Sequence, residues 1–334
     1  MLFKRLGIDL GTANSVIYLQ GKGIVLNEPS VVAVSVDDRR VVAVGNEAKE
    51  MLGRTPGNII ASRPMREGVI ADYVVTEAML RYFIQRVCGR SFLFKPEVMV
   101  CIPAGCTQVE KRAVEDATIS AGARNVYVIA EPLAAAIGAS IPIGEASGNM
   151  IVDIGGGACE AAVISLGGVV VAKSLRVAGN KFDDALSSYI RKKHNLLVGE
   201  TTAEEIKILI GSALKMKENK KIDVKGRDSI TGLPRKVEIT ANEISDSLKN
   251  PLVQIVSMVK SVLEEVPPEL ASDIIDKGIV LSGGSSLLHN LDRLLTEETG
   301  VACHVTEEPM LAVAKGVGVV LENLEDYKRS ITKR

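Results

Sequence analysis

The sequence predicts an α/β protein made of two related halves that face each other across a cleft. Three observations predict this fold class. A unit of strand, turn and hairpin near the start of the chain is repeated in the middle. Segments with the two-residue period of strands alternate with segments of helical period. Glycine-rich turns follow three of the apolar strands, a pattern typical of phosphate-binding sites.

The repeated unit is an apolar strand that runs into an aspartate and a glycine-rich turn. Residues 8–13 read Ile-Asp-Leu-Gly-Thr-Ala, and residues 152–157 read Val-Asp-Ile-Gly-Gly-Gly. Each copy is followed by two apolar runs around a glycine turn, at 16–26 and at 162–171, and this pattern predicts a β-hairpin. Because the whole unit occurs twice, we expect two domains of common design.

The other segments alternate between helix and strand. Thr107 is placed as the N-cap of a helix, with Glu110 completing a capping box, and Pro132 opens a helix of small residues. In chain order we predict a helix at 74–87, a strand at 97–102, a helix at 107–121, a strand at 126–130, the helix opened by Pro132, a helix at 203–217, a strand at 278–281, a helix at about 286–298 and a helix from near Met310.

Composition excludes several classes of function. The net charge is −1, there is no Trp and aromatic residues make up only 3%, so we expect no nucleic-acid partner. The lysine-rich stretch at 215–225 is interleaved with acids and is expected to be a solvated face. None of the five cysteines forms a C-x-x-C pair, which argues against a disulfide framework or a zinc site. The N-terminus leaves no room for a signal peptide and no apolar run approaches ~18 residues, so we expect a cytoplasmic protein.

The glycine-rich turns at 9–14, 153–157 and 281–286 are candidate phosphate-binding loops. Glycines let the backbone approach a phosphate and point N–H groups at it. Asp9 and Asp153 would repel a bare phosphate, so we expect Mg²⁺ and its waters between them and the phosphates. Any one turn is more often a simple strand-to-hairpin bend, but the three together favour phosphate binding. The P-loop and dinucleotide motifs are both missing from the sequence.

Two interpretations of Glu131 stay open on the residues alone. Glu131 precedes Pro132 at a helix start, where the helix dipole favours an acid. Alternatively, its carboxylate lies at the floor of the cleft and positions or polarises an attacking water. The spacing by itself favours the first interpretation.

Long strings spread along the chain carry a family resemblance. They are residues 7–14, 27–32, 63–65, 68–72, 131–132, 134–138, 147–150, 152–157, 267–270, 273–275, 308–309 and 313–316. These strings closely resemble the MreB/Mbl family of the actin superfamily, and the match covers essentially the whole chain. They are far more specific than the phosphate turns, which chaperones and sugar kinases of the superfamily share.

The resemblance implies an actin-like ATPase fold, with two related α/β halves around a nucleotide cleft. The first half is expected at 1–144 and is closed by 310–334, with a small inserted subdomain at about 32–72. The second half is expected at 145–309, with its insert at about 181–243.

The resemblance also implies roles for individual residues. Glu131 matches the water-positioning catalytic carboxylate, and Asp9 and Asp153 match the acids on the magnesium side, which act through water. The nucleotide contacts of the family, for ATP, fall on Gly11, Thr12, Ala13, Asn14, Gly155, Gly156, Gly157, Glu204, Glu205, Ile206, Lys207, Gly284, Ser285, Ser286 and Leu287.

Some positions depart from the family pattern. Ala158 and Cys159 stand where two hydroxyl residues are usual, and Leu209 stands where an acid is common. Ser285 and Ser286 replace the more usual Gly-Ala or Gly-Ser. The lost hydroxyls bear on the rate of hydrolysis more than on nucleotide binding.

By resemblance, ATP favours polymerisation of the chain with itself into paired protofilaments, and slow hydrolysis tunes their turnover. The filaments would lie on the inner face of the cytoplasmic membrane and organise the membrane proteins of cell-wall elongation, which maintains rod shape. A chaperone-type ATPase and a small-molecule kinase of the same superfamily are the alternatives. The first needs a peptide-binding domain after residue 334, and the second needs a substrate pocket and base that the sequence does not reveal.

An apolar loop is the candidate membrane contact. Gly89 and Pro96 mark a loop that contains the apolar residues Phe92, Leu93 and Phe94 between two basic residues. Relatives in the MreB family present an apolar membrane loop at this place. The alternative is that the aromatic side chains pack back into the core.

Overall fold

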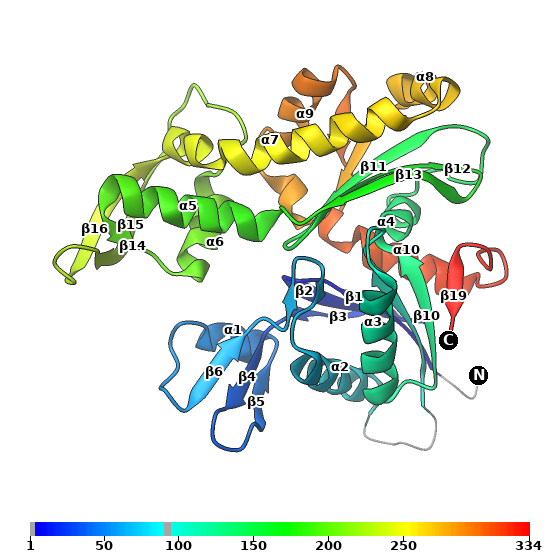
Figure 1. Ribbon diagram of the computed structural model, residues 1–334, viewed down its shortest axis with the longest axis horizontal. Helices are drawn as coiled ribbons and strands as arrows, with labels where there is room; N and C mark the ends of the chain where they lie inside the picture. The colour runs from blue at the N-terminus through cyan, green and yellow to red at the C-terminus, as the bar shows by residue number, and fades with distance from the viewer. Residues whose placement is uncertain (1–3, 90–94) are drawn as a thin grey trace.

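The computed structural model describes residues 4–89 and 95–334 (Figure 1). Two main sheets form the body of the molecule, two three-stranded sheets lie at one end of its long axis, and a two-stranded sheet is the fifth. The strands are β1 (Arg5–Leu10), β2 (Asn14–Leu19), β3 (Gly23–Pro29), β4 (Val32–Ser35), β5 (Val41–Val44), β6 (Ile59–Ser62), β7 (Met65–Arg66), β8 (Val69–Ile70), β9 (Glu97–Ile102), β10 (Asn125–Ala130), β11 (Asn149–Ile154), β12 (Cys159–Ser165), β13 (Gly168–Leu175), β14 (Leu196–Leu197), β15 (Lys221–Asp228), β16 (Pro234–Thr240), β17 (Ile279–Ser282), β18 (Cys303–Val305) and β19 (Ile331–Lys333).

The two main sheets share one topology over five strands, and the first sheet has β19 as an additional edge strand. The first has the order β19-β10-β9-β1-β2-β3, and the second has the order β18-β17-β11-β12-β13. In each, the strand that carries the aspartate pairs antiparallel with the first strand of its hairpin and parallel with a later strand. The internal repeat in the sequence therefore corresponds to a repeated sheet, and both predicted hairpins are confirmed.

Helices fill the layers around the two sheets (Figure 1). On the outer face of the first sheet, Phe83 of α2 and Val114 of α3 share a core with its strands. Between the sheets, Leu133 of α4 and Val317 of α10 pack against residues of both sheets. On the outer face of the second sheet, Phe182 of α5 belongs to a core shared with α7, α8 and α9. The helices are α1 (Asn46–Met51), α2 (Tyr73–Cys88), α3 (Gln108–Ser120), α4 (Glu131–Gly138), α5 (Gly179–His194), α6 (Glu200–Ile210), α7 (Ala241–Glu265), α8 (Pro268–Lys277), α9 (Leu291–Thr299) and α10 (Ala312–Glu322), with short 3₁₀ turns η1 (Gly284–Leu287) and η2 (Pro309–Leu311).

The smaller sheets fall inside the segments expected to be inserted subdomains. The sheet β5-β4-β6 lies within residues 32–72, and the sheet β14-β15-β16 lies within residues 181–243. The domain boundaries themselves stay predictions.

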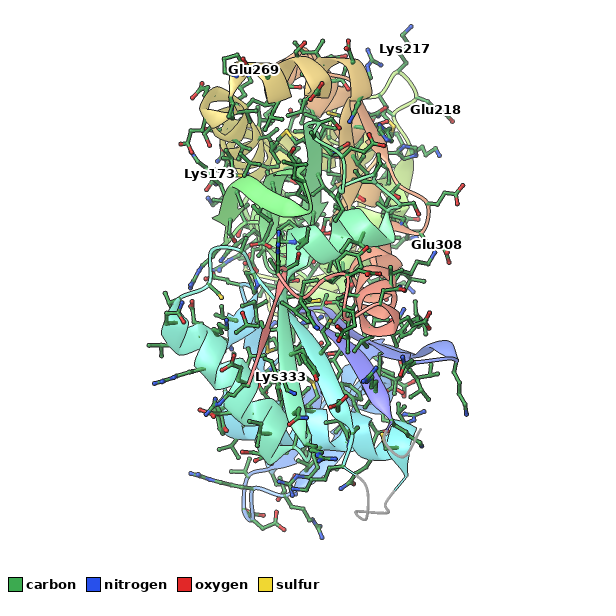
Figure 2. All side chains as sticks on the ribbon, turned by 90° about the vertical axis from the view of Figure 1, so that its right-hand side faces the viewer. Lys173, Lys217, Glu218, Glu269, Glu308 and Lys333 are labelled. Atoms are coloured by element: carbon green, nitrogen blue, oxygen red, sulfur yellow. The ribbon has the colours of Figure 1, made fainter. Side chains whose placement is uncertain are left out.

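Local sequence signals placed most elements correctly. Thr107 caps α3 and forms the predicted capping box with Glu110. The five lysines of the 215–225 stretch are exposed as predicted, and Lys217 projects into solvent beside Glu218 (Figure 2).

Two helix predictions were wrong at their ends. The helix predicted at 203–217 is α6, which begins at Glu200 and ends at Ile210 because Gly211 adopts an extended conformation. The helix predicted from residue 286 begins only at Leu291. The 3₁₀ turn η1 and a left-handed Asn290, with φ of 60°, precede it.

Candidate functional site

The three glycine-rich turns meet at one place between the two sheets. The Ser285 hydroxyl donates a hydrogen bond of 2.7 Å to the carbonyl of Gly155, which joins the third turn to the second. A Cβ atom at Gly156 would lie only 2.6 Å from that of Ala13, so the second turn packs directly on the first. The candidate phosphate loops are thus in mutual contact, although nothing local in the sequence requires it.

The first turn is held by its neighbours on both sides. The carbonyl of Gly11 accepts a hydrogen bond from the Ser30 hydroxyl at 2.6 Å. The buried Thr12 hydroxyl accepts one from the N–H of Gly68, in the turn between β7 and β8, at 3.0 Å. Asn14 donates from its amide to the neighbouring strand β3. These bonds fix the loop before any ligand arrives.

Four carboxylates lie close enough to interact beneath these turns. Burial and the charge of Asp153 raise the pKa of Asp9 to about 7. Burial also raises the pKa of Asp153, against a 2.6 Å hydrogen bond from the Ser282 hydroxyl. Burial, then Glu160 and the two aspartates, raise the pKa of Glu131 well above its usual range. No salt bridge in the described part of the chain reaches any of these four acids.

Glu160 is the member of this group that sequence reasoning missed. Its side chain is 1% exposed, and it accepts hydrogen bonds from the N–H of Ala104 at 2.9 and 3.2 Å. Burial raises the pKa of Glu160 to about 8 despite hydrogen bonds from Ser174 and the backbone. The available signal was a lone acid in the otherwise apolar strand β12.

Asp9 and Asp153 fit the magnesium role that the resemblance implies. They supply carboxylate oxygens, the donors that Mg²⁺ prefers, and their mutual repulsion would be relieved by a cation. Within residues 4–89 and 95–334, no cluster of three or more His, Cys, Asp or Glu side chains is arranged to hold a metal ion. Two protein acids leave most positions of an octahedral ion to water and phosphate oxygens.

The residues expected near adenosine lie on α6 and η1, but the protein itself already engages several of them. Glu204 forms a 3.1 Å ion pair with Lys49. Lys207 pairs with Asp183 at 2.9 Å. Ile206 is turned into the core, and Glu205 is exposed. On η1, Ser285 and Ser286 are buried, whereas Leu287 is 57% exposed.

Two residues that depart from the family pattern lie beside the second candidate phosphate loop, and both are buried. Ala158 and Cys159 both have little exposure, and Cys159 is the first residue of β12. Burial raises the pKa of the Cys159 thiol well above its usual range, so the group stays a neutral thiol.

The predicted membrane loop of Phe92, Leu93 and Phe94 lies outside the described residues. At the end of α2, the ammonium of Lys4 donates to the carbonyls of Val87 and Cys88. Among the helices that the structure describes, none is both long and apolar enough to cross a bilayer.

Comparisons with known proteins agree on one family. The model of the family described as "MreB/Mbl protein" matches residues 3–329. The chain is 54% identical over 330 residues to the cell shape-determining protein MreB of Escherichia coli strain K12, covering 97% of this chain and 95% of that protein.

Solved structures show the same fold. MreB5 of Spiroplasma citri bound to AMPPNP superimposes with a TM-score of 0.92 at 34% identity and 98% coverage of both chains, and a second structure of that protein is bound to ADP. A MamK double helical filament, at 20% identity and a TM-score of 0.81 over 95% of this chain and 99% of that one, supports the fold alone.

Proposed function

The chain belongs to the MreB/Mbl protein family, and on that premise we propose that it is an ATP-dependent, filament-forming protein that determines cell shape. It has the actin-like fold of its structural neighbours. The observation that carries the proposal is the contact of three glycine-rich turns above four carboxylates that have no salt-bridge partner among the described residues, within a chain that matches this family over residues 3–329.

Nucleotide binding is the first part of the proposal. MreB5, which shares 34% identity, binds AMPPNP and ADP. In this chain the turns at 11–14 and 155–157 would hold the phosphates by backbone N–H groups. Glu204 to Lys207 and Gly284 to Leu287 would contact the adenosine, with exposed Leu287 offering apolar surface to the base.

Slow ATP hydrolysis is the second part. When bound through Asp9 and Asp153, Mg²⁺ supplies the positive charge that this site lacks. Glu131 would then hold the attacking water by a hydrogen bond, the role for which its position under the turns suits it. Glu160 accepts a hydrogen bond from the N–H of Ala104, which ties β12 to the loop that follows β9.

Assembly and location complete the proposal. The partners are further copies of the same chain in paired protofilaments, the inner face of the cytoplasmic membrane, and membrane proteins of wall elongation. Residues 92–94 would provide the membrane contact. Each buried apolar side chain contributes roughly 1.5–3 kcal/mol, so stable attachment depends on the many subunits of a filament.

Sedimentation tests the function directly. Purified protein should pellet in Mg-ATP and stay in the supernatant without nucleotide. Protein that binds ATP but never pellets would point to the kinase alternative. Replacing Leu93 and Phe94 with Ser and Gln should abolish pelleting with anionic liposomes while ATP-dependent assembly survives. Retained liposome binding would exclude the loop as the membrane contact.

A further inference from the structure

Arg63 makes contacts on both sides of the proposed nucleotide site. It follows β6 of the inserted sheet, and its side chain is only 12% exposed. The Nε–H of Arg63 donates a hydrogen bond of 2.7 Å to Oε1 of Glu200, the first residue of α6. Another nitrogen donates to the carbonyl of Ala13, in the first phosphate turn, at 3.4 Å. A single side chain therefore ties the phosphate turn to the helix expected to contact adenosine.

A second ion pair runs beside the first. Lys49 of α1 lies 3.1 Å from Glu204 of α6, with the two side chains 34% and 25% exposed. Both pairs join the sheet β5-β4-β6 and its flanking residues to the same helix. α6 follows β14 directly and lies beside the sheet β14-β15-β16 (Figure 1). The two inserted segments are thus fastened to each other at the end where they lie together.

We propose that the Arg63–Glu200 and Lys49–Glu204 pairs form a clasp across the nucleotide site, whose opening limits nucleotide exchange. Arg63 is the positioning residue of this clasp. The proposal rests on nucleotide binding at the three turns, and it adds which contacts hold the nucleotide in.

The physical reason is that the two side chains of the first pair differ in exposure: Arg63 is 12% exposed and Glu200 is 53% exposed. A guanidinium that is nearly buried loses its main ionic partner when Glu200 moves away, and it retains only the long contact with Ala13. Breaking a hydrogen bond to such a charged, desolvated group is more costly than breaking an exposed pair. By contrast, Arg176 pairs with Glu67 and Glu110, and Lys181 pairs with Glu67, across the same two halves. The basic side chain of each of these pairs is 44–56% exposed, so the pairs should contribute little.

The test measures the dissociation of a fluorescent ATP analogue from the full-length protein. Analogue bound with Mg²⁺ is chased with excess ATP at a protein concentration too low for assembly. Arg63→Ala and Glu200→Gln should each speed dissociation on the order of tenfold, as expected for losing a charge-assisted hydrogen bond. The double variant should be no faster than Arg63→Ala alone, because both changes break the same contact.

Two further variants separate the contacts. Arg63→Lys can keep the pair with Glu200 but cannot reach Ala13 with the same group, so it should dissociate at an intermediate rate. Lys260→Ala is the matched control, since it removes a 2.7 Å pair with Glu298 that lies within the second half. That variant should keep the wild-type rate.

The outcomes distinguish the clasp from the function on which it rests. Glu200→Gln changes an exposed side chain, so it should fold normally and leave single-turnover hydrolysis of bound ATP unchanged while it speeds release. Wild-type dissociation rates in both Arg63→Ala and Glu200→Gln, or effects that multiply in the double variant, overturn the clasp alone. A wild-type protein that binds no analogue overturns the proposed function and the clasp with it.

Discussion

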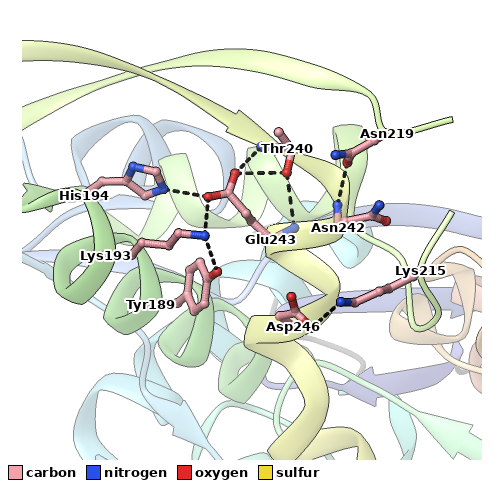
Figure 3. Close-up of polar contacts among 9 residues, drawn as sticks. All are labelled: Tyr189, Lys193, His194, Lys215, Asn219, Thr240, Asn242, Glu243 and Asp246. Atoms are coloured by element: carbon pink, nitrogen blue, oxygen red, sulfur yellow. Dashed lines mark hydrogen bonds and ion pairs between the residues drawn. The ribbon is translucent and has the colours of Figure 1, made fainter. Parts of the chain in front are cut away.

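The fold shifts the pKa of the acids beneath the glycine-rich turns and the pKa of Glu243, at the junction of α5 and α7, in opposite directions. Glu243 accepts hydrogen bonds from Lys193 at 2.8 Å, from His194 at 3.0 Å and from the N–H and hydroxyl of Thr240 at 2.9 Å (Figure 3). Burial alone would raise its pKa, but Lys193 and Thr240 outweigh burial and lower the pKa of Glu243 to about 2. Beneath the turns, burial dominates and the pKa of Glu160 rises to about 8.

The difference separates an acid that the fold itself neutralises from acids that we propose act on a bound ligand. At the α5–α7 junction the protein supplies its own cations and donors, so the charge is satisfied without any ligand. Between the sheets the acids repel one another, and an incoming cation would relieve them. Changes at the first place should therefore cost stability, and changes at the second should cost activity.

Loss of Glu131 should have the largest effect. Glu131→Gln removes the group proposed to hold the water but no proposed nucleotide contact, so phosphate release in assembled protein should fall about 10²-fold. ATP affinity should stay within a few fold. Glu269→Gln is a matched control, because Glu269, like Glu131, is an acid next to a proline in the first turn of its helix. Equal rates in the two variants would make Glu131 a helix-start residue only.

Asp153→Asn should weaken the magnesium-dependent binding of ATP by about tenfold, as expected for losing one charged partner of the ion. The melting temperature of the nucleotide-free protein should not fall, because the change removes one of several repelling charges and Asn can still accept from Ser282. Titration of ATP at several Mg²⁺ concentrations measures the first quantity. An unchanged magnesium dependence would exclude Asp153 from the metal site.

Glu243→Gln should lower the stability of the protein and leave its ATP affinity unchanged. We expect a loss of about 1 kcal/mol in the free energy of unfolding. Most of it should come from the capping box that Glu243 and Thr240 form at the start of α7, because the partly exposed pairs with Lys193 and His194 contribute little. Urea denaturation measures this change. ATP affinity should equal that of the wild type, and a loss of affinity would show that the two regions are coupled.

The pH dependence of stability should carry opposite signs in the two regions. Glu160 has a folded-state pKa of about 8, above its unfolded value, so the folded state binds more protons and stability falls as pH rises toward 8. Glu243 has a lowered pKa, so its contribution is present above the unfolded pKa and is lost as pH falls toward 2. Thermal melts of nucleotide-free protein should show the first slope at less than about 1.4 kcal/mol per pH unit for one group. Glu160→Gln should flatten it, and an unchanged slope would assign it to other groups.

Local signals in the sequence determined the repeated strand, turn and hairpin units, the capped helix α3 and the glycine turns, because these depend on periodicity and on neighbours along the chain. The family resemblance selected Glu131, whose spacing alone favoured a helix start. The ends of α6 and α9 were misplaced, since Gly211 and Asn290 end or delay helices through backbone conformations that periodicity does not reveal.

Only the tertiary structure decided which side chains share the site. Glu160 is an acid in an apolar strand until the fold sets it beside Ala104, 56 residues earlier in the chain. The ion-pair partner of Arg63 is Glu200, which lies 137 residues later in the chain, so no local pattern indicates the pair. Pairing across such separations depends on how two sheets and their inserted segments pack, and electrostatic burial follows from that packing. Sequence determines which groups are available, and the fold decides which of them remain unsatisfied.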